Sequence, residues 1–89
     1  MRAVITVLGK DTVGILASVS AACATHRVNI LEVTQSVLQD FFAMMMLVDI
    51  ANADIPLDSF ADELNALGQQ QQLSVHVMHE DIFTSMHEI

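Results

Sequence analysis

The centre of the chain carries two strand-like runs separated by only two residues. The first run, Ile30–Leu38, alternates apolar and polar residues, which predicts an edge strand with one buried face and one wetter face. The second run, Phe41–Ile50, is apolar at nearly every position. Its three consecutive methionines would also suit a helix. The preceding strand and the short reversal at Gln39-Asp40 instead favour a hairpin. Gln-Asp is a weaker turn signal than Asn-Gly. The alternating residues are Leu31, Val33 and Val37 on the side expected to be buried, and Glu32, Thr34 and Ser36 on the other.

One helical run lies on each side of this hairpin. The first is expected from Val13 to His26, and the second begins near Pro56, where the missing N–H of a proline costs nothing. Gly68 is expected to end the second helix. The stripes at helical spacing are Ile15, Val19, Ala22 and His26 in the first run, and Leu57, Phe60, Ala61, Leu64 and Leu67 in the second.

Extended runs also open and close this arrangement. Arg2–Leu8 is β-branched and apolar, which is typical of a central strand covered on both faces. Leu73–Met78 alternates, and a short helix is expected from Glu80 to about His87. The order β-α-β-β-α-β predicts a single α+β domain over residues 1–89, a ferredoxin-like sandwich. Its four-stranded antiparallel sheet has the two longer helices on one face, and the short C-terminal helix follows the last strand.

The run Phe41–Ile50 is apolar on both of its faces, whereas the predicted helices cover only one. An uncovered apolar face of this kind usually marks an interface. The chain is also 53% hydrophobic with only four Phe and no Trp or Tyr, which is more aliphatic surface than one small core can hide. We therefore expect self-association, most simply a homodimer joined by sheet contacts.

The charge balance excludes several partners. Three Lys+Arg stand against eleven Asp+Glu, for a formal net charge of −8, so the chain lacks the basic side chains that binding to nucleic acid or to an anionic membrane surface requires. No apolar run approaches the ~20 residues of a membrane helix, and no signal peptide is visible. The single cysteine, Cys23, allows no internal disulfide, which favours a reducing, cytoplasmic setting.

A short glycine-bounded segment, Gly9–Gly14, joins the first expected strand to the first helix. This arrangement leaves the free N–H groups of a helix's first turn facing outward, where they and the helix dipole suit an anionic ligand. Asp11 is placed to cap the same N–H groups. The alternative is therefore that Asp11 only caps the helix and that the two glycines only allow a tight turn.

The chain resembles the ACT domain family of small regulatory modules. The residues that carry the resemblance are ITVLGKDTVGIL (5–16), HRVNI (26–30) and the hairpin TQSVLQDFFAMMMLVDI. The closing EDIFTSMHEI resembles the tail of a stand-alone, single-domain subgroup, so the resemblance covers essentially the whole chain. It implies that the turn after the first strand and the start of the first helix bind a small amino acid, often at the interface with a second copy.

Carried over residue by residue, the resemblance implies a ligand site made by Gly9, Asp11, Val13 and Gly14 with the backbone of Ile15 and Leu16, completed by Asn29 of a neighbouring copy. Val13 stands where proline is frequent in relatives. First-turn N–H groups would bind the carboxylate of an amino acid, and Asp11 would accept from its ammonium group. The expected ligand is therefore an amino acid or a similar small zwitterion.

The sequence contains no catalytic constellation, so we expect no enzymatic activity and no cofactor. The nearest approach to a metal cluster is near the C-terminus, but His76 and His79 are three residues apart on a strand and so point to opposite sides. We expect surface histidines and no metal there, and Cys23 should be a small packing residue. The C-terminal cluster of candidate metal ligands comprises His76, His79, Glu80, Asp81 and His87.

An alternative to the sensor is a ligand-free interaction module that docks an unknown protein partner through the apolar sheet face.

Overall fold

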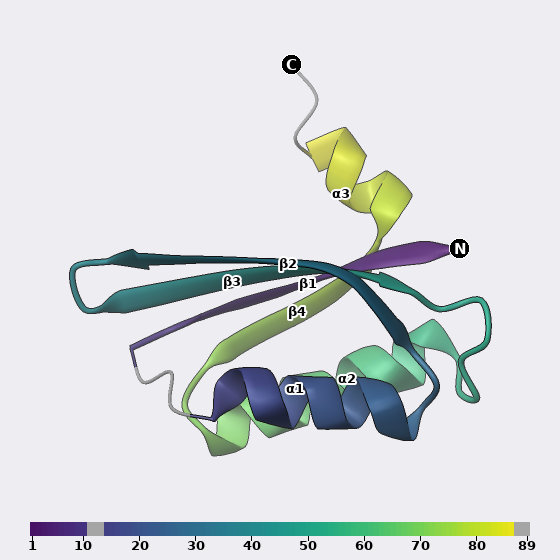
Figure 1. Cartoon of the computed structure of the whole chain (residues 1–89), viewed down its shortest axis with the longest axis horizontal. Coiled ribbons are helices and arrows are strands. Elements are labelled where there is room, and N and C mark those ends of the chain that lie inside the picture. Colours follow the sequence, from purple (N-terminus) through teal and green to yellow (C-terminus); the bar gives the residue numbers. More distant parts are fainter. Residues whose placement is uncertain (11–13, 87–89) are drawn as a thin grey trace.

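The computed structural model describes residues 1–10 and 14–86, and these form a four-stranded antiparallel sheet with two helices packed beneath it (Figure 1). A third, short helix rises from the opposite face. This is the ferredoxin-like α+β fold that the sequence predicts. The elements are β1 (Arg2–Gly9), α1 (Ile15–Thr25), β2 (Asn29–Leu38), β3 (Phe41–Asp49), α2 (Leu57–Gln70), β4 (Ser74–His79) and α3 (Glu80–Met86).

The strands lie in the order β2-β3-β1-β4, so β1 is central and β2 is an edge strand, as predicted. Gly9 pairs with Phe42 at one end of the sheet, and Arg2 pairs with Asp49 at the other. The two-residue reversal at Gln39-Asp40 is confirmed, and Gln39 takes a positive φ of 56° there. The hairpin therefore projects from the sheet end that carries Gly9.

The core lies between the sheet and the layer formed by α1 and α2. Met44 and Met46 are buried in it, whereas Met45 points to the opposite face and is 42% exposed. This alternation identifies the methionine run as strand, as expected. The core also contains Ile5, Val7, Ile15, Val19, Cys23, Val48, Phe60 and Leu64.

The edge strand β2 differs from its prediction. Leu31, Val33 and Val37 were expected to be buried, but they are 46%, 37% and 70% exposed. Among the β2 side chains that the structure describes, only Ile30 packs against the apolar core. The edge position in the prediction is correct, but the buried face is wrong because the core does not reach these three side chains.

Two further predictions need correction. α2 does not end at Gly68 but continues to Gln70, and Gly68 is buried within it. A β-carbon at Gly68 would lie 2.5 Å from Cγ2 of Val75 and 2.9 Å from the carbonyl oxygen of Leu73, so this glycine allows α2 to approach β4 closely. In β1, which was expected to be covered on both faces, Leu8 is 52% exposed.

None of the helices in the described part of the chain is long and apolar enough to cross a membrane. The first helix begins at Ile15 and ends at Thr25, with His26 as its C-terminal cap. The predicted start at Val13 and the predicted end of the last helix near His87 fall outside the described residues.

Candidate functional site

The turn between β1 and α1 contains the first part of the predicted ligand site. Gly14 precedes the helix with φ of 78°, a left-handed conformation that favours glycine, and its carbonyl accepts a hydrogen bond from the Ser18 N–H at 2.9 Å. A β-carbon at Gly14 would meet no atom of the described residues within 4 Å, and the positive φ is the feature of this position that favours glycine. Asp11 and Val13 lie outside the described residues.

No side chain of the described residues caps the N-terminus of α1. Ile15 is buried in the core and anchors the helix, so its side chain is not available to a ligand. Leu16 is partly exposed beside it, at 38%. The first turn of α1 is therefore held by the buried Ile15 side chain, and none of the described side chains caps its amide groups.

Gly9 ends β1 directly against Leu73, whose side chain occupies the place that a β-carbon would take. Next to it, the ammonium group of Lys10 lies 5.6 Å from the ring centroid of Phe41, within cation–π range. A surface hollow of about 360 Å³ adjoins this end of the sheet. Its lining residues are Gly9, Lys10, Phe41, Gln71 and Gln72.

Asn29, the other part of the predicted site, lies at the opposite end of the sheet. It pairs with Asp49, which in turn pairs with Arg2. β1 is eight residues long, so the ends that carry Gly9 and Arg2 are about 23 Å apart. One chain therefore does not bring Asn29 to the β1–α1 turn, and only a second copy can place the two side by side.

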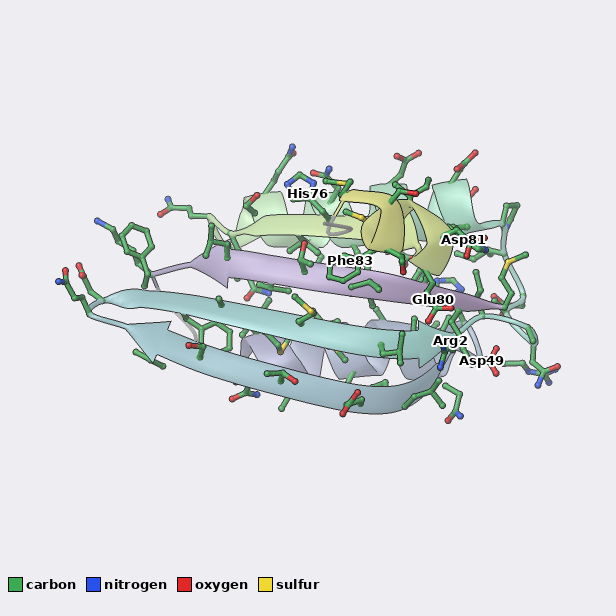
Figure 2. All side chains as sticks on the ribbon, turned by 90° about the horizontal axis from the view of Figure 1, so that it is seen from above. Arg2, Asp49, His76, Glu80, Asp81 and Phe83 are labelled. Atoms are coloured by element: carbon green, nitrogen blue, oxygen red, sulfur yellow. The ribbon has the colours of Figure 1, made fainter. Side chains whose placement is uncertain are left out.

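The open face of the sheet, opposite α1 and α2, has two halves. At the Arg2 end, Figure 2 shows α3 above the sheet, with Phe83 extending over it; Phe83 lines a hollow with Val4 and Leu47. Arg2 pairs with Glu80 at 2.5 Å and ties the start of α3 to β1. α3 is thus fastened to this half by one aromatic side chain and one ion pair.

The other half of the open face is a hollow of about 390 Å³ that lies toward the Gly9 end. Leu8 and Met45 expose apolar surface in it. His76, visible on β4 in Figure 2, contacts the hydroxyl of Ser74 through Nε2 at 3.1 Å. We call this the open-face hollow, and its lining residues are Thr6, Val7, Leu8, Thr34, Ser36, Ala43, Met44, Met45, Ser74 and His76.

A charged cluster that sequence reasoning missed joins α1 to α2. Nδ1 of His26 lies 2.9 Å from Oδ1 of Asp54, and Nε2 lies 2.5 Å from Oε2 of Glu63, a contact that is an ion pair when the ring is protonated. The ring edge faces Phe60 at a centroid distance of 6.0 Å. The hydrogen bond to Asp54 raises the pKa of His26, and Glu63 acts in the same direction against the effect of burial.

The C-terminal polar cluster does not assemble into one site. Nδ1 of His79 accepts a hydrogen bond from the Asp81 N–H at 3.0 Å, while His76 faces the open-face hollow. The described part of the chain contains no group of three His, Cys, Asp or Glu able to hold a metal ion. Cys23 is fully buried, and burial raises the pKa of its thiol to about 11, so it packs as a neutral side chain.

Comparison with known proteins identifies the family. A sequence model of the ACT domain matches residues 2–78. The chain is 43% identical to the UPF0237 protein MK1213 of Methanopyrus kandleri over 88 residues, which cover 99% of this chain and 98% of that protein. An ACT domain protein from Streptococcus pneumoniae superposes with a TM-score of 0.81 at 35% identity and covers 93% of both chains. A putative glycine cleavage system transcriptional repressor has a TM-score of 0.67 at 25% identity, over 85% of this chain and 43% of that one. The chain therefore belongs to the ACT domain family, within which it is similar along its whole length to the UPF0237 proteins.

Proposed function

We propose that this ACT domain is a regulatory module that binds an amino acid or a similar small zwitterion between two copies of the chain. The observation that carries the proposal is the start of α1, where Gly14 turns the backbone into the helix and no described side chain caps the first-turn amides. Such amides bind a carboxylate well. Membership of a family of regulatory, small-ligand-binding domains supports the same reading.

A second copy is required because the two parts of the proposed site lie far apart in a single chain. Gly9 and Asn29 lie at opposite ends of the sheet, so a site containing both needs Asn29 from a neighbour. In the proposed complex the carboxylate of the ligand lies at the α1 N-terminus and its ammonium group lies nearer Asp11. The output passes to a partner protein, without a catalytic step, in the cytoplasm.

A thermal-shift screen against the amino acids tests the proposal. We expect one amino acid, or a few, to raise the melting temperature in a saturable way. Acetate and methylamine, which each carry one end of the zwitterion, should produce no comparable shift at equal concentration. An unchanged melting temperature with every amino acid at saturating concentration would contradict the proposal.

A second candidate function is protein–protein interaction without a ligand. The open-face hollow favours it, because Leu8 and Met45 expose apolar surface there at 52% and 42%. Under this function no amino acid shifts the melting temperature, whereas a charged substitution at Leu8 weakens association. The response to amino acids therefore separates the two candidates.

A further inference from the structure

We propose that two copies pack with their open sheet faces together, so that α3 of each copy enters the open-face hollow of the other. This contact is distinct from the ligand site of the proposed function and needs no bound ligand. It assigns a role to α3 and to the hollow.

α3 is the projecting part of this interface. It stands out from the open face (Figure 1), held by the Arg2–Glu80 ion pair and by Phe83 above Val4. Its other apolar residues are not used in the chain's own fold: Ile82 is 55% exposed and Met86 is 66% exposed. Two large apolar side chains on a seven-residue helix that projects from the molecule need a cover.

The open-face hollow is the receiving part. Its volume is about 390 Å³, its floor includes Leu8 and Met45, and its rim carries hydroxyl groups and His76. An apolar floor with a polar rim is the usual anatomy of a protein interface. The hollow contains no carboxylate and no lysine or arginine, so apolar side chains can enter it without burying an unpaired charge.

The positions of the two features fix the symmetry of the pair. α3 covers the Arg2 end of the face, and the hollow lies toward the Gly9 end. A twofold axis that runs across the strands reverses their direction, so each α3 lies above the hollow of the other copy. This makes the interface self-complementary and closed, as in most homodimers.

The proposed contact is separate from the proposed ligand site. α1 lies on the helix side of the sheet, whereas the contact uses the open face, so the start of α1 in each copy lies outside the interface. The arrangement therefore covers the exposed residues of α3 and fills the hollow without involving the ligand.

The exposed area of the single chain agrees with a missing partner. Its accessible surface is 5677 Å², whereas a compact monomer of 9.7 kDa has about 5,100 Å². The excess is of the same order as the ~800 Å² that each partner contributes to an interface of standard size. A second copy on the open face accounts for it.

Light scattering on wild-type protein and matched variants, without any amino acid present, tests the proposal. The wild type should have twice the chain mass of 9.7 kDa. Ile82→Lys and Leu8→Glu should each give the single-chain mass, because each places a charge in an apolar contact. Val37→Glu is the matched control: Val37 is 70% exposed, but it pairs with Phe42 on the helix side of the sheet and should leave the dimer intact. Circular dichroism checks that each variant is folded, and Met86→Glu replaces Ile82→Lys if that chain fails to fold.

An equimolar mixture of Ile82→Lys and Leu8→Glu chains tests whether positions 82 and 8 of different copies meet. In a mixed pair, Lys at position 82 meets Glu at position 8 in one contact, and the other contact is wild type, so the dimer mass should return. Four outcomes would each overturn the arrangement: a monomeric wild type, a dimeric Ile82→Lys variant, dissociation by Val37→Glu, or a mixture that stays monomeric.

A dimer with these properties but no thermal shift with any amino acid would contradict only the ligand site. A monomer that still shows the shift would contradict the interface and the contribution of Asn29 from a second copy, but not a ligand site at the start of α1.

Discussion

Nδ1 of His26 lies 2.9 Å from Oδ1 of Asp54, although 28 residues separate the two in the sequence. The contact fastens the C-terminal end of α1 to the segment that precedes α2. The same two residues are also joined by a backbone hydrogen bond, because the Asp54 N–H donates to the His26 carbonyl at 3.1 Å. Glu63 adds a second carboxylate from α2. The imidazole thus links both helices of the layer beneath the sheet.

This cluster makes stability depend on pH. Because the hydrogen bond to Asp54 and the nearby Glu63 raise the pKa of His26 in the folded state, folding favours the protonated ring. The stabilisation is fully present below the unfolded pKa of about 6.5 and is lost as the pH rises through the folded value. Urea unfolding at pH 6 and pH 9 should show a larger loss of stability for the wild type than for His26→Gln. Equal losses in the two proteins would show that the cluster has no such effect.

Gly68→Ala should destabilise the chain even though alanine is the better helix former. The gain in helix propensity is about 1 kcal/mol, but the new β-carbon would lie 2.5 Å from Cγ2 of Val75 and 2.9 Å from a backbone oxygen. Overpacking of this kind costs roughly 1–3 kcal/mol, so we expect a net loss of about 1 kcal/mol in urea unfolding. Asn65→Ala, at an exposed position of the same helix, is the control and should be neutral or slightly stabilising. A stabilised Gly68→Ala variant would mean that α2 and β4 can separate at little cost.

Gly14→Ala tests a different property of glycine. Within the described part of the chain no atom lies within 4 Å of the added β-carbon, so the expected cost comes from the left-handed backbone with φ of 78°. We expect a loss of about 1 kcal/mol in the free energy of unfolding, and a smaller loss for Gly14→Asn because asparagine tolerates this conformation better. An Ala variant as stable as the wild type would show that the turn adopts another conformation in solution.

Asp11→Ala should abolish the melting shift caused by the amino acid found in the screen, because the proposed partner of the ammonium group is removed. The dimer mass should not change. Asp62→Ala is the matched control, since it removes the same charge from an exposed position on α2. A shift retained by Asp11→Ala and lost by Asp62→Ala would place the ligand elsewhere.

Much of the fold follows from local patterns. The alternation that places Met44 and Met46 in the core and leaves Met45 outside agrees with a strand, as the adjacent hairpin predicts. The helix stripe that contains Phe60 and Leu64 likewise identifies the buried side of α2. Periodicity reports which side of an element is apolar, and here the apolar side of these elements is the buried one.

The errors arise where burial depends on distant parts of the chain. Val33 and Val37 have the spacing of a buried face, but the apolar core formed by distant parts of the chain does not include them. Gly68 looks like a helix stop because nothing local shows that β4 passes so close to it. The partners of His26 come from other elements, so no spacing pattern identifies the cluster.

The candidate site shows the same division. The turn around Gly14 could be found from its position between a strand and a helix, and its left-handed conformation agrees with the choice of glycine. The position of Asn29 could not be predicted in the same way, because the sheet topology places it at the far end of the sheet. Its contacts with the turn depend on how a second copy is arranged.

The most direct test of the central claim is a map of backbone amide shifts by NMR as the amino acid from the screen is added. We predict that the largest changes are at Gly14, Ile15 and Leu16, with a further change at Asn29, and that they saturate at one ligand per chain. Changes confined to Leu8, Met45 and His76 in the open-face hollow, or no changes at all, would contradict the proposed site.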